Sequence, residues 1–359
     1  MLKGSVDIDD HKRIEEIDIH NMLTFLEEFP RQCTQAVEIG RLSCSHIIAD
    51  LPRVKNLSIL GMGGSGVSGD IARIVFEPHL KIPVTVNKSY DLPAFVNENS
   101  LVFAVSYSGE TEETLTSARV ALERGAQLVA ITSGGALLDL AEKEGLPLIK
   151  IPEGLAPRLA VGYLSIPVLI YLSSLGFVYP IEDDIEELIE MLSAKSKGYS
   201  SKVSSERNQA KRLANQLYGK IPIIYGDSGI SGLAALRWKC QFNENSKVPA
   251  FNNSLPEMNH NEIVGWEELV NANREFFLMT LRDSAENPQL TKRFTATKDL
   301  ISDRFAGAIE LESSGKSRLT RLFSLIYLGD FASVYLALLY GIDPTPVDRI
   351  QVLKSLIAK

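Results

Sequence analysis

Three hydroxyl side chains gather at one turn between an expected strand and an expected helix. The segment VSYSGET (105–111) follows the apolar run LVFAV (101–105) and precedes a helix-prone stretch. Ser106, Ser108 and Thr111 therefore surround a helix N-terminus, where backbone N–H groups lack a partner within the helix. Hydroxyls and amides together can hold a phosphate dianion without a lysine. The simpler alternative is a serine-rich helix cap.

A glycine-rich stretch, GMGGSGVSGD (61–70), follows a second apolar run at 57–60. Glycines at a strand-to-helix turn let backbone N–H groups approach an anion, and Gly64 and Ser65 lie in this turn. The stretch has no Walker lysine, and it does not match a dinucleotide fingerprint with its distant acidic residue. A nucleotide site is therefore not indicated, and a plain tight turn remains the alternative.

Short apolar runs alternate with helix-prone stretches along most of the chain. This alternation predicts βαβ units, and hence parallel sheets with helices on both faces. The predicted strands are 57–60, 84–86, 101–105, 128–131 and 148–151 in the first half, and 221–225, 276–281 and 308–311 in the second. The predicted helices begin near residues 65, 110 and 135, and later span 231–241, 289–302, 317–340 and 347–358.

The two halves share a motif as well as a layout. Residues 64–69 read GSGVSG and residues 227–232 read DSGISG. Each motif follows an apolar strand and precedes a helical stretch. A duplicated domain is the interpretation we favour, although chance similarity between glycine- and serine-rich segments is the alternative.

The combination GGSGxSG and, about forty residues later, SYSGxTxET resembles the sugar isomerase (SIS) domain. A tandem pair resembles the phosphoglucose isomerase superfamily, in particular its bifunctional phosphoglucose/phosphomannose isomerase branch. The resemblance covers nearly the whole chain and implies an α/β fold of two tandem SIS-type doubly wound domains, with parallel sheets flanked by helices. It also implies a metal-free, cofactor-free aldose–ketose isomerase that acts through a cis-enediol.

The resemblance implies a set of site residues. The catalytic ones are Glu244 in NENSK, His260 in PEMNHNE, Arg158 in PRLA and Lys354 in VDRIQVLK. The substrate phosphate is expected on Gly64, Ser65, Ser106, Ser108 and Thr111. In the family these positions meet in one pocket, and the histidine comes from the neighbouring subunit of a homodimer.

These residue types suit the implied chemistry. Glu244 can carry a proton between C2 and C1 if its surroundings tune its pKa. His260 can exchange protons at the ring oxygen near neutral pH, with help from Lys354, and Arg158 can stabilise the enediolate oxygen. Glucose and mannose 6-phosphate differ only at C2, which becomes planar in the enediol, so one site can convert both into fructose 6-phosphate.

Each catalytic assignment has a simpler alternative. Glu244 and its neighbours also fit an ordinary solvated surface, and Glu257 and Glu262 are rival bases close to His260. His260 also fits a hydrogen-bonded loop histidine. Arg158 also fits a structural ion pair, and Lys354 a surface lysine near the chain end.

Bulk properties narrow the classes of partner. A net charge of -8 over 359 residues argues against a nucleic-acid partner, because there is no surplus of cations. The three cysteines form no CxxC pair, and the first residues contain no apolar signal core. Both features favour a cytoplasmic location.

The histidines form no cluster in the sequence, so a metal site is not indicated. The uncharged run Leu159–Val178 is long enough to span a bilayer, but we interpret it as a buried helix between domains.

The sequence thus predicts four regions and one activity. Residues 1–53 are expected to form helices that pack on the first domain, with a capping residue near Asp18 and an amphipathic pattern that continues to Ile47. The regions that follow are a phosphate-binding SIS domain at 54–180, a helical connector at 181–217 and a second SIS domain at 218–359. Another SIS-domain phosphosugar isomerase, or a non-catalytic phosphosugar-binding protein, is the alternative function.

Overall fold

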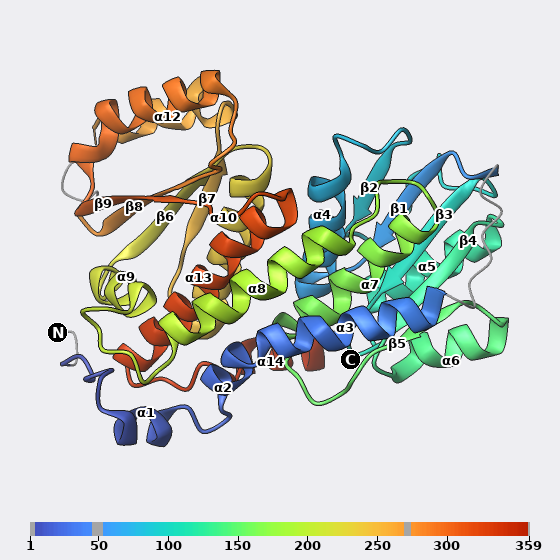
Figure 1. The fold of residues 1–359 in the computed structure, drawn as a ribbon, viewed down its shortest axis with the longest axis horizontal. Helices are drawn as coiled ribbons and strands as arrows, with labels where there is room; N and C mark the ends of the chain where they lie inside the picture. Colours follow the sequence, from blue (N-terminus) through green and yellow to red (C-terminus); the bar gives the residue numbers. More distant parts are fainter. Residues whose placement is uncertain (1–3, 45–52, 269–273, 358–359) are drawn as a thin grey trace. The chain divides into compact units, whose positions relative to one another are not determined.

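The computed structural model describes residues 4–44, 53–268 and 274–357. The chain forms two compact units (Figure 1). We call Phe29–Ile189 the first unit, and Met1–Glu28 together with Glu190–Lys359 the second unit.

The first unit is built on a five-stranded sheet in which every neighbouring pair is parallel, with the order β2-β1-β3-β4-β5. Its strands are β1 (Asn56–Leu60), β2 (Val84–Asn87), β3 (Ser100–Val105), β4 (Gln127–Thr132) and β5 (Leu148–Lys150). Its helices are α3 (Phe29–Cys44), α4 (Gly63–Phe76), α5 (Glu112–Glu123), α6 (Gly135–Glu144) and α7 (Val161–Ser174). All five predicted strands of this half are confirmed.

Helices cover both faces of the first sheet. Val102 and Ala104 of β3 pack in one apolar cluster with residues of α5 and α6. Phe103 points to the opposite face, where its ring meets Tyr171 of α7 edge-on at 5.2 Å. Because successive side chains of a strand alternate between faces, a strand covered on both sides is apolar throughout, as β3 is.

The uncharged run Leu159–Val178 forms α7, whose 14 residues lie within the first unit rather than between domains. Its residues from Val161 to Leu172 are buried, and it packs on α3 and α4. At 1.5 Å per residue, α7 is too short to cross a bilayer. Among the described residues, only α13 (Arg318–Leu339) has the length and composition of a membrane span, and it is wholly buried in the structure.

The second unit repeats the topology with four parallel strands in the order β7-β6-β8-β9. The strands are β6 (Ile221–Gly226), β7 (Phe251–Ser254), β8 (Phe276–Arg282) and β9 (Gly307–Glu312). The helices are α1 (His11–Ile17), α2 (Met22–Glu27), α9 (Gln209–Leu217), α10 (Ile230–Gln241), α12 (Pro288–Ile301), α13 and α14 (Asp348–Ile357), while α8 (Glu182–Tyr199) begins in the first unit. The matching strand order supports a duplicated domain.

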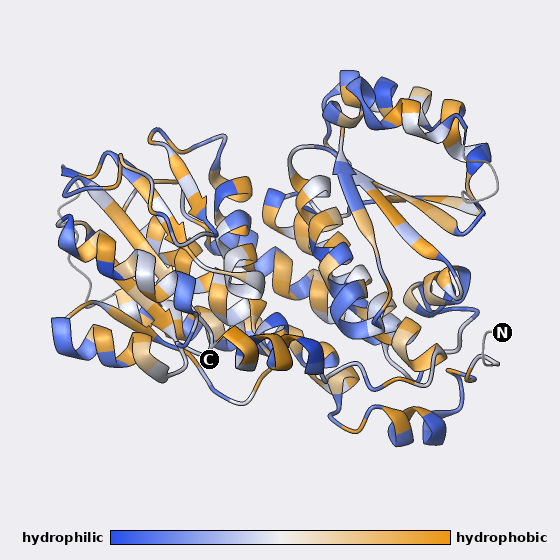
Figure 2. Ribbon diagram, turned by 180° about the vertical axis from the view of Figure 1, so that it is seen from behind, coloured by the Kyte–Doolittle hydropathy of each residue, from blue (hydrophilic) through white to orange (hydrophobic). Residues whose placement is uncertain are grey.

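Helices also cover both faces of the second sheet. Phe294 and Ile301 of α12 pack with Ile223 and Leu278 on one face, and α10 packs on the other face with α13 behind it. Figure 1 shows α12 and α10 on opposite sides of this sheet, and Figure 2 shows that the strands of both sheets are largely hydrophobic. The predicted fold class, two parallel α/β sheets flanked by helices, is confirmed.

Residues 4–28 differ from the prediction that residues 1–53 pack on the first domain. α3 does lie in the first unit, but α1 and α2 belong to the second unit. The carboxylate of Asp18 caps α2, accepting from the backbone N–H groups of Met22 and Leu23 at 2.8 and 2.9 Å. Residues 1–3 and 45–52 of this predicted segment, Ile47 included, lie outside the described residues.

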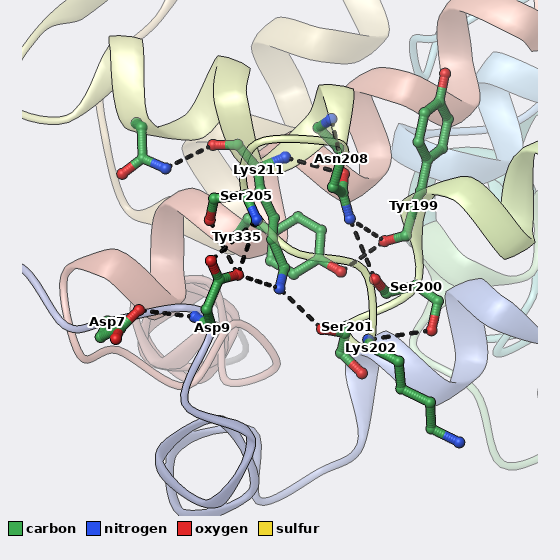
Figure 3. A network of polar contacts seen from close by, with 12 residues as sticks. Asp7, Asp9, Tyr199, Ser200, Ser201, Lys202, Ser205, Asn208, Lys211 and Tyr335 are labelled. Carbon is green, nitrogen blue, oxygen red and sulfur yellow. Dashed lines mark hydrogen bonds and ion pairs between the residues drawn. The ribbon is translucent and has the colours of Figure 1, made fainter.

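A buried lysine explains why the N-terminal segment joins the second unit (Figure 3). The side chain of Lys211 in α9 is fully buried, and its ammonium donates to Asp9 at 2.9 Å and to the Ser201 carbonyl at 2.8 Å. The same ammonium lies 5.4 Å from the centre of the Tyr335 ring. A buried ammonium needs a counter-charge, and Asp9 supplies it from the N-terminal segment.

The predicted connector, 181–217, is not a separate element in the structure. α8 runs without a break across the division between the units at Ile189. α9 packs against α13, with Leu213, Ala214 and Leu217 buried. The amphipathic face of α9 therefore makes it part of the second unit.

Candidate active site

The loop after β3 brings together two of the predicted phosphate ligands. The hydroxyl oxygens of Ser106 and Thr111 lie 2.9 Å apart, and the N–H of Gly109 donates to Ser106 at 3.1 Å. Ser108 accepts from the N–H of Glu110 at 3.2 Å. Thr111 occupies the N-cap position of α5 but makes no side-chain capping bond. The three hydroxyls therefore organise the turn before α5 rather than cap its first N–H groups, so the simple helix-cap interpretation is wrong.

The first turn of α4 joins the same loop. The hydroxyl of Ser65, which is 5% exposed, accepts from the N–H of Tyr107 at 3.2 Å. β1 and β3 are adjacent and parallel, so the turns that follow them lie at one edge of the sheet. We call Gly64, Ser65, Ser106, Ser108 and Thr111 the hydroxyl cradle.

Arg158 reaches this edge through a close backbone contact. A Cβ added at Gly64 would lie 2.9 Å from the carbonyl oxygen of Pro157, so only glycine allows this approach. Arg158 follows Pro157 in a short 3₁₀ turn (Pro157–Leu159) and is 5% exposed. The structure thus brings Arg158 and the hydroxyl cradle together within the first unit.

Two residues at this edge were not singled out from the sequence. The hydroxyl of Tyr107 donates to the Pro152 carbonyl at 3.1 Å and accepts from the N–H of Leu155 at 2.8 Å, which ties the cradle to the segment before Arg158. Lys88, just after β2, forms an ion pair with Asp70 of α4. Their positions in the sequence could have indicated them, since Lys88 directly follows β2 and Tyr107 lies two residues after β3 of the same sheet.

In the second unit, Glu244 lies in a π-helical turn, η3 (Phe242–Ser246), at the end of α10. Its neighbours are anchored to α13: the Asn245 amide donates to the Ser333 hydroxyl at 2.9 Å, and the Ser246 hydroxyl donates to the Ser333 carbonyl at 2.6 Å. π-helical turns are rare and are frequent at functional sites. Both anchors are buried, and Glu244 between them is partly exposed.

A buried ion pair fixes the two helices that carry this turn. Arg237 of α10 and Asp330 of α13 are 3% and 4% exposed and pair at 2.8 Å, and Gln241 donates to the same carboxylate at 2.9 Å. Satisfied buried polar groups of this kind restrict two packed helices to one register. The backbone of Glu244 is therefore held in place by two rigidly packed helices.

Glu244 borders a cavity of about 800 Å³ within the second unit. The residues that line it come from the segment around Glu244 and from the segment that leads into α14: Asn243, Glu244, Lys247, Val248, Pro249, Ile342, Asp343, Pro346, Val347, Asp348, Arg349 and Ile350. The lining is mixed, with carboxylate, cationic and apolar groups. A polar ligand the size of a sugar phosphate fits such a volume.

His260 and Lys354 are not among the residues that line this cavity. His260 lies exposed in a 3₁₀ turn (Glu257–His260), and Lys354 lies exposed on α14 beyond the cavity-lining Ile350. Within the second unit, the structure therefore brings Glu244 to the start of α14 but leaves these two side chains facing outwards.

The rival bases near His260 are engaged in other contacts. Glu262 accepts from the hydroxyl of Tyr225 and from the amide of Asn253, the latter at 2.5 Å. Burial raises the pKa of Tyr225, and the Glu262 carboxylate raises it further, so this phenol stays a donor. Glu257 is exposed and accepts from Asn261 at 3.0 Å.

In the second copy of the glycine motif, a side chain of the motif itself binds the N–H groups of the turn. Asp227 stands where the first copy has Gly64, and its carboxylate Oδ1 accepts from the N–H of Gly229 at 2.9 Å and that of Gly232 at 3.1 Å. The hydroxyl of Ser231 donates to the same oxygen at 3.0 Å. A phosphate would accept from donors of this kind, and in the duplicated turn the Asp227 carboxylate accepts from them instead.

Comparisons with known proteins agree with this architecture. Residues 50–142 match the family described as SIS domain, and residues 206–357 match the bacterial phospho-glucose isomerase C-terminal SIS domain. A bifunctional phosphoglucose/phosphomannose isomerase from Caldicellulosiruptor bescii is 44% identical over 94% of this chain and 99% of its own length. Another from Aquifex aeolicus is 37% identical over 87% and 93%.

A solved structure of a hypothetical protein from Thermus thermophilus has the same fold. Its TM-score is 0.73, with 17% identity over 96% of this chain and 94% of that protein. The resemblance seen in the glycine and hydroxyl motifs is thus confirmed along almost the full length. The chain belongs to the family of bifunctional phosphoglucose/phosphomannose isomerases.

Proposed function

We propose that this chain is an aldose–ketose isomerase that interconverts glucose 6-phosphate and mannose 6-phosphate with fructose 6-phosphate through a cis-enediol. The observation that carries the proposal is membership of the family over nearly the whole chain. The reaction moves protons within one substrate and leaves its overall oxidation state unchanged. The proposal therefore includes no cofactor and no metal.

The phosphate end of the substrate is assigned to the hydroxyl cradle. Its support is geometric, because Ser106 and Thr111 form one hydroxyl pair and Ser65 is bonded to the same loop. The N-terminus of α5, which Thr111 does not cap through its side chain, supplies partial positive charge. Neutral donors and a helix dipole bind a dianion that can still dissociate.

Glu244 is assigned as the base that carries the proton between C2 and C1. The anchors on either side of it and the cavity in front of it support this role. Proton transfer by a positioned carboxylate gives on the order of 10²–10⁴-fold acceleration. The planar enediol carbon can be reprotonated to either C2 configuration, so one base serves both aldoses.

Arg158, His260 and Lys354 are assigned to the remaining steps. Arg158, buried against the cradle, stabilises the enediolate oxygen as a permanent cation. His260 exchanges the proton at the ring oxygen during ring opening, and Lys354 assists at the anomeric hydroxyl.

A homodimer is part of the proposal, with His260 completing the site of the partner subunit. His260 is exposed in the single chain, which supports a role outside it. α14 has no buried residue and exposes five apolar side chains: Ile350, Val352, Leu353, Leu356 and Ile357. Exposed apolar surface of this kind is typical of an association site.

A cytoplasmic location is also proposed. Cys33, Cys44 and Cys240 form no disulfide in the structure, as expected in a reducing compartment.

The direct test is turnover of each aldose phosphate, with fructose 6-phosphate detected by a coupled assay. The proposal expects both glucose 6-phosphate and mannose 6-phosphate to be converted, and fructose 6-phosphate to give both in return. Conversion of neither, with binding retained, would make the chain a phosphosugar-binding protein. Conversion of a different phosphosugar alone would assign it to another SIS-domain isomerase.

A further inference from the structure

The ammonium group of Lys247 holds the turn that carries Glu244. The ammonium nitrogen donates to three backbone carbonyls: those of Glu244 at 2.6 Å, Asn245 at 3.3 Å and Pro344 at 2.9 Å. A lysine ammonium has three N–H donors, so it can serve all three carbonyls at once. Two acceptors belong to the π-helical turn and the third belongs to the segment between α13 and α14.

The two segments that Lys247 joins are the two walls of the cavity next to Glu244. Glu244 and Lys247 stand on one wall, and residues from Ile342 to Ile350 form the other. The second wall continues directly into α14, which carries Lys354. A change in the Lys247 contacts would therefore alter the distance between the proposed base and the opposite wall.

The backbone of Lys247 adopts the left-handed conformation. Its φ is 57°, and in the described part of the chain Asn21 is the only other non-glycine residue with positive φ. Glycine adopts this conformation without strain and asparagine adopts it more readily than lysine does. The backbone N–H of Lys247 closes the π-helical turn on the Phe242 carbonyl. The strained position is thus occupied by a residue whose side chain returns to bind the same turn.

We propose that Lys247 is a positioning residue for isomerisation: its ammonium binds the π-helical turn to the Pro344 segment and so aims the Glu244 carboxylate into the cavity. The inference rests on the proposed role of Glu244 as the base. Lys247 acts through Glu244 rather than on the substrate, because its ammonium is bound to the backbone carbonyls of Glu244, Asn245 and Pro344. Misplacement of a reacting group by about 1 Å costs on the order of 10²-fold in rate.

Two substitutions separate the ammonium from the backbone strain. Lys247→Met keeps most of the stem and removes the donors, whereas Lys247→Gly removes the donors and also relieves the left-handed backbone. Lys247→Arg keeps a cation and serves as the conservative variant. The matched control is Lys220→Met, because Lys220 also donates to a backbone carbonyl, that of Arg274 at 3.3 Å, and is not among the residues that line the cavity.

Steady-state kinetics with fructose 6-phosphate and thermal unfolding of each variant test the proposal. We expect Lys247→Met and Lys247→Gly to lower kcat about 10- to 100-fold with KM within about twofold, even if Lys247→Gly unfolds at the wild-type temperature or above. Lys247→Arg should recover part of kcat, and Lys220→Met should match the wild type. A purely structural role predicts instead that kcat follows the unfolding temperature and is restored in Lys247→Gly.

The proposal is overturned if folded Lys247→Met or Lys247→Gly keeps the wild-type kcat, or if only KM changes. Glu244→Gln distinguishes this outcome from failure of the proposed function. An inactive Glu244→Gln beside a fully active Lys247→Met refutes the positioning role and leaves the base in place. A fully active Glu244→Gln refutes the base, and the positioning role with it.

Discussion

The hydroxyl oxygens of Ser106 and Thr111 lie 2.9 Å apart, across the turn that separates β3 from α5. Ser106 is completely buried and Thr111 is partly exposed, so the pair presents one hydroxyl to the surface and supports it with another. Such a pair can rotate its two O–H groups towards an arriving anion without moving the backbone. This relationship is the basis for assigning the phosphate end of the substrate.

Replacing both hydroxyls should weaken substrate binding. Hydrogen bonds to a charged group contribute about 1.5–3 kcal/mol each, so loss of both in Ser106→Ala with Thr111→Ala should raise KM by about 100-fold or more. Steady-state kinetics with fructose 6-phosphate measure the change.

The control for this double variant is Thr34→Ala with Ser43→Ala, which removes the same two residue types from α3. In the described part of the chain, these hydroxyls bond to carbonyls four residues earlier in their own helix, at 3.2 and 2.8 Å. The control should keep the wild-type KM. An unchanged KM in Ser106→Ala/Thr111→Ala would show that this loop does not hold the phosphate.

Asp227 should matter for stability and not for catalysis. Its carboxylate accepts from Gly229, Ser231 and Gly232 at the N-terminus of α10. Loss of a capping acceptor costs about 0.5–2 kcal/mol, so Asp227→Ala should lower the free energy of unfolding in urea by about that amount. Asp227→Asn keeps one acceptor oxygen and should lose less.

The KM of both Asp227 variants should stay at the wild-type value, because the hydroxyl cradle belongs to the first unit. A large rise in KM with unchanged stability would instead place the second glycine motif in contact with the substrate.

The exposed apolar side chains of α14 should mediate self-association. Leu353 and Leu356 are 55% and 61% exposed in the single chain, and burial of a leucine contributes about 1.5–3 kcal/mol. Leu353→Asp with Leu356→Asp should therefore shift a dimer to monomers in sedimentation velocity. The same change at Leu300 of α12, which is 66% exposed, should leave the dimer intact. A dimer that survives the α14 double variant would exclude α14 from the interface.

The Asp9–Lys211 pair should make stability depend on pH. Burial raises the pKa of Asp9, but the hydrogen bonds from Lys211 and Ser205 outweigh it, so the pKa of Asp9 lies below 3.8. A lowered pKa in the folded state means that the contribution is present above the unfolded value and is lost as pH falls through the folded one. Asp9 is 39% exposed, so water screens part of the interaction.

Asp9→Asn should therefore be less stable than the wild type by about 1–2 kcal/mol at pH 7, because it leaves the buried Lys211 without a counter-charge. The difference should begin to shrink as pH falls below the unfolded pKa of about 4, and it should vanish only below the lowered pKa of Asp9 in the folded state. Urea titrations at pH 7 and pH 3 measure it. A difference of the same size at both pH values would remove the electrostatic explanation.

The sequence predicted the sheets well, because their central strands are apolar on both faces. β7 (Phe251–Ser254) was missed because it is a polar, partly exposed edge strand with no apolar run. The N-terminal helices were assigned to the first domain, since nothing local signals that Asp9 pairs with Lys211, 202 positions away. Contacts between distant residues decide such placements, and periodicity does not report them.

The residue types of the candidate site were predictable from the sequence, but the contacts that hold them in place were not. The hydroxyl motif identified Ser106 and Thr111 because both lie in the turn that follows a predicted strand. The π-helical turn at Glu244 and its anchors on Ser333 had no signature, since each bond joins residues almost 90 positions apart. The catalytic roles of Glu244, His260, Lys354 and Arg158 stay predictions, as does the phosphate-binding role of the hydroxyl cradle.

The most direct test of the central claim follows fructose 6-phosphate in heavy water by NMR, for the wild type and for Glu244→Gln. We expect the wild type to place deuterium at C2 of both glucose 6-phosphate and mannose 6-phosphate, because both arise from one enediol reprotonated by a carboxylate that exchanges with solvent. Glu244→Gln should still bind fructose 6-phosphate but show no exchange and no isomerisation. Wild-type exchange and turnover in the Glu244→Gln variant would contradict the account.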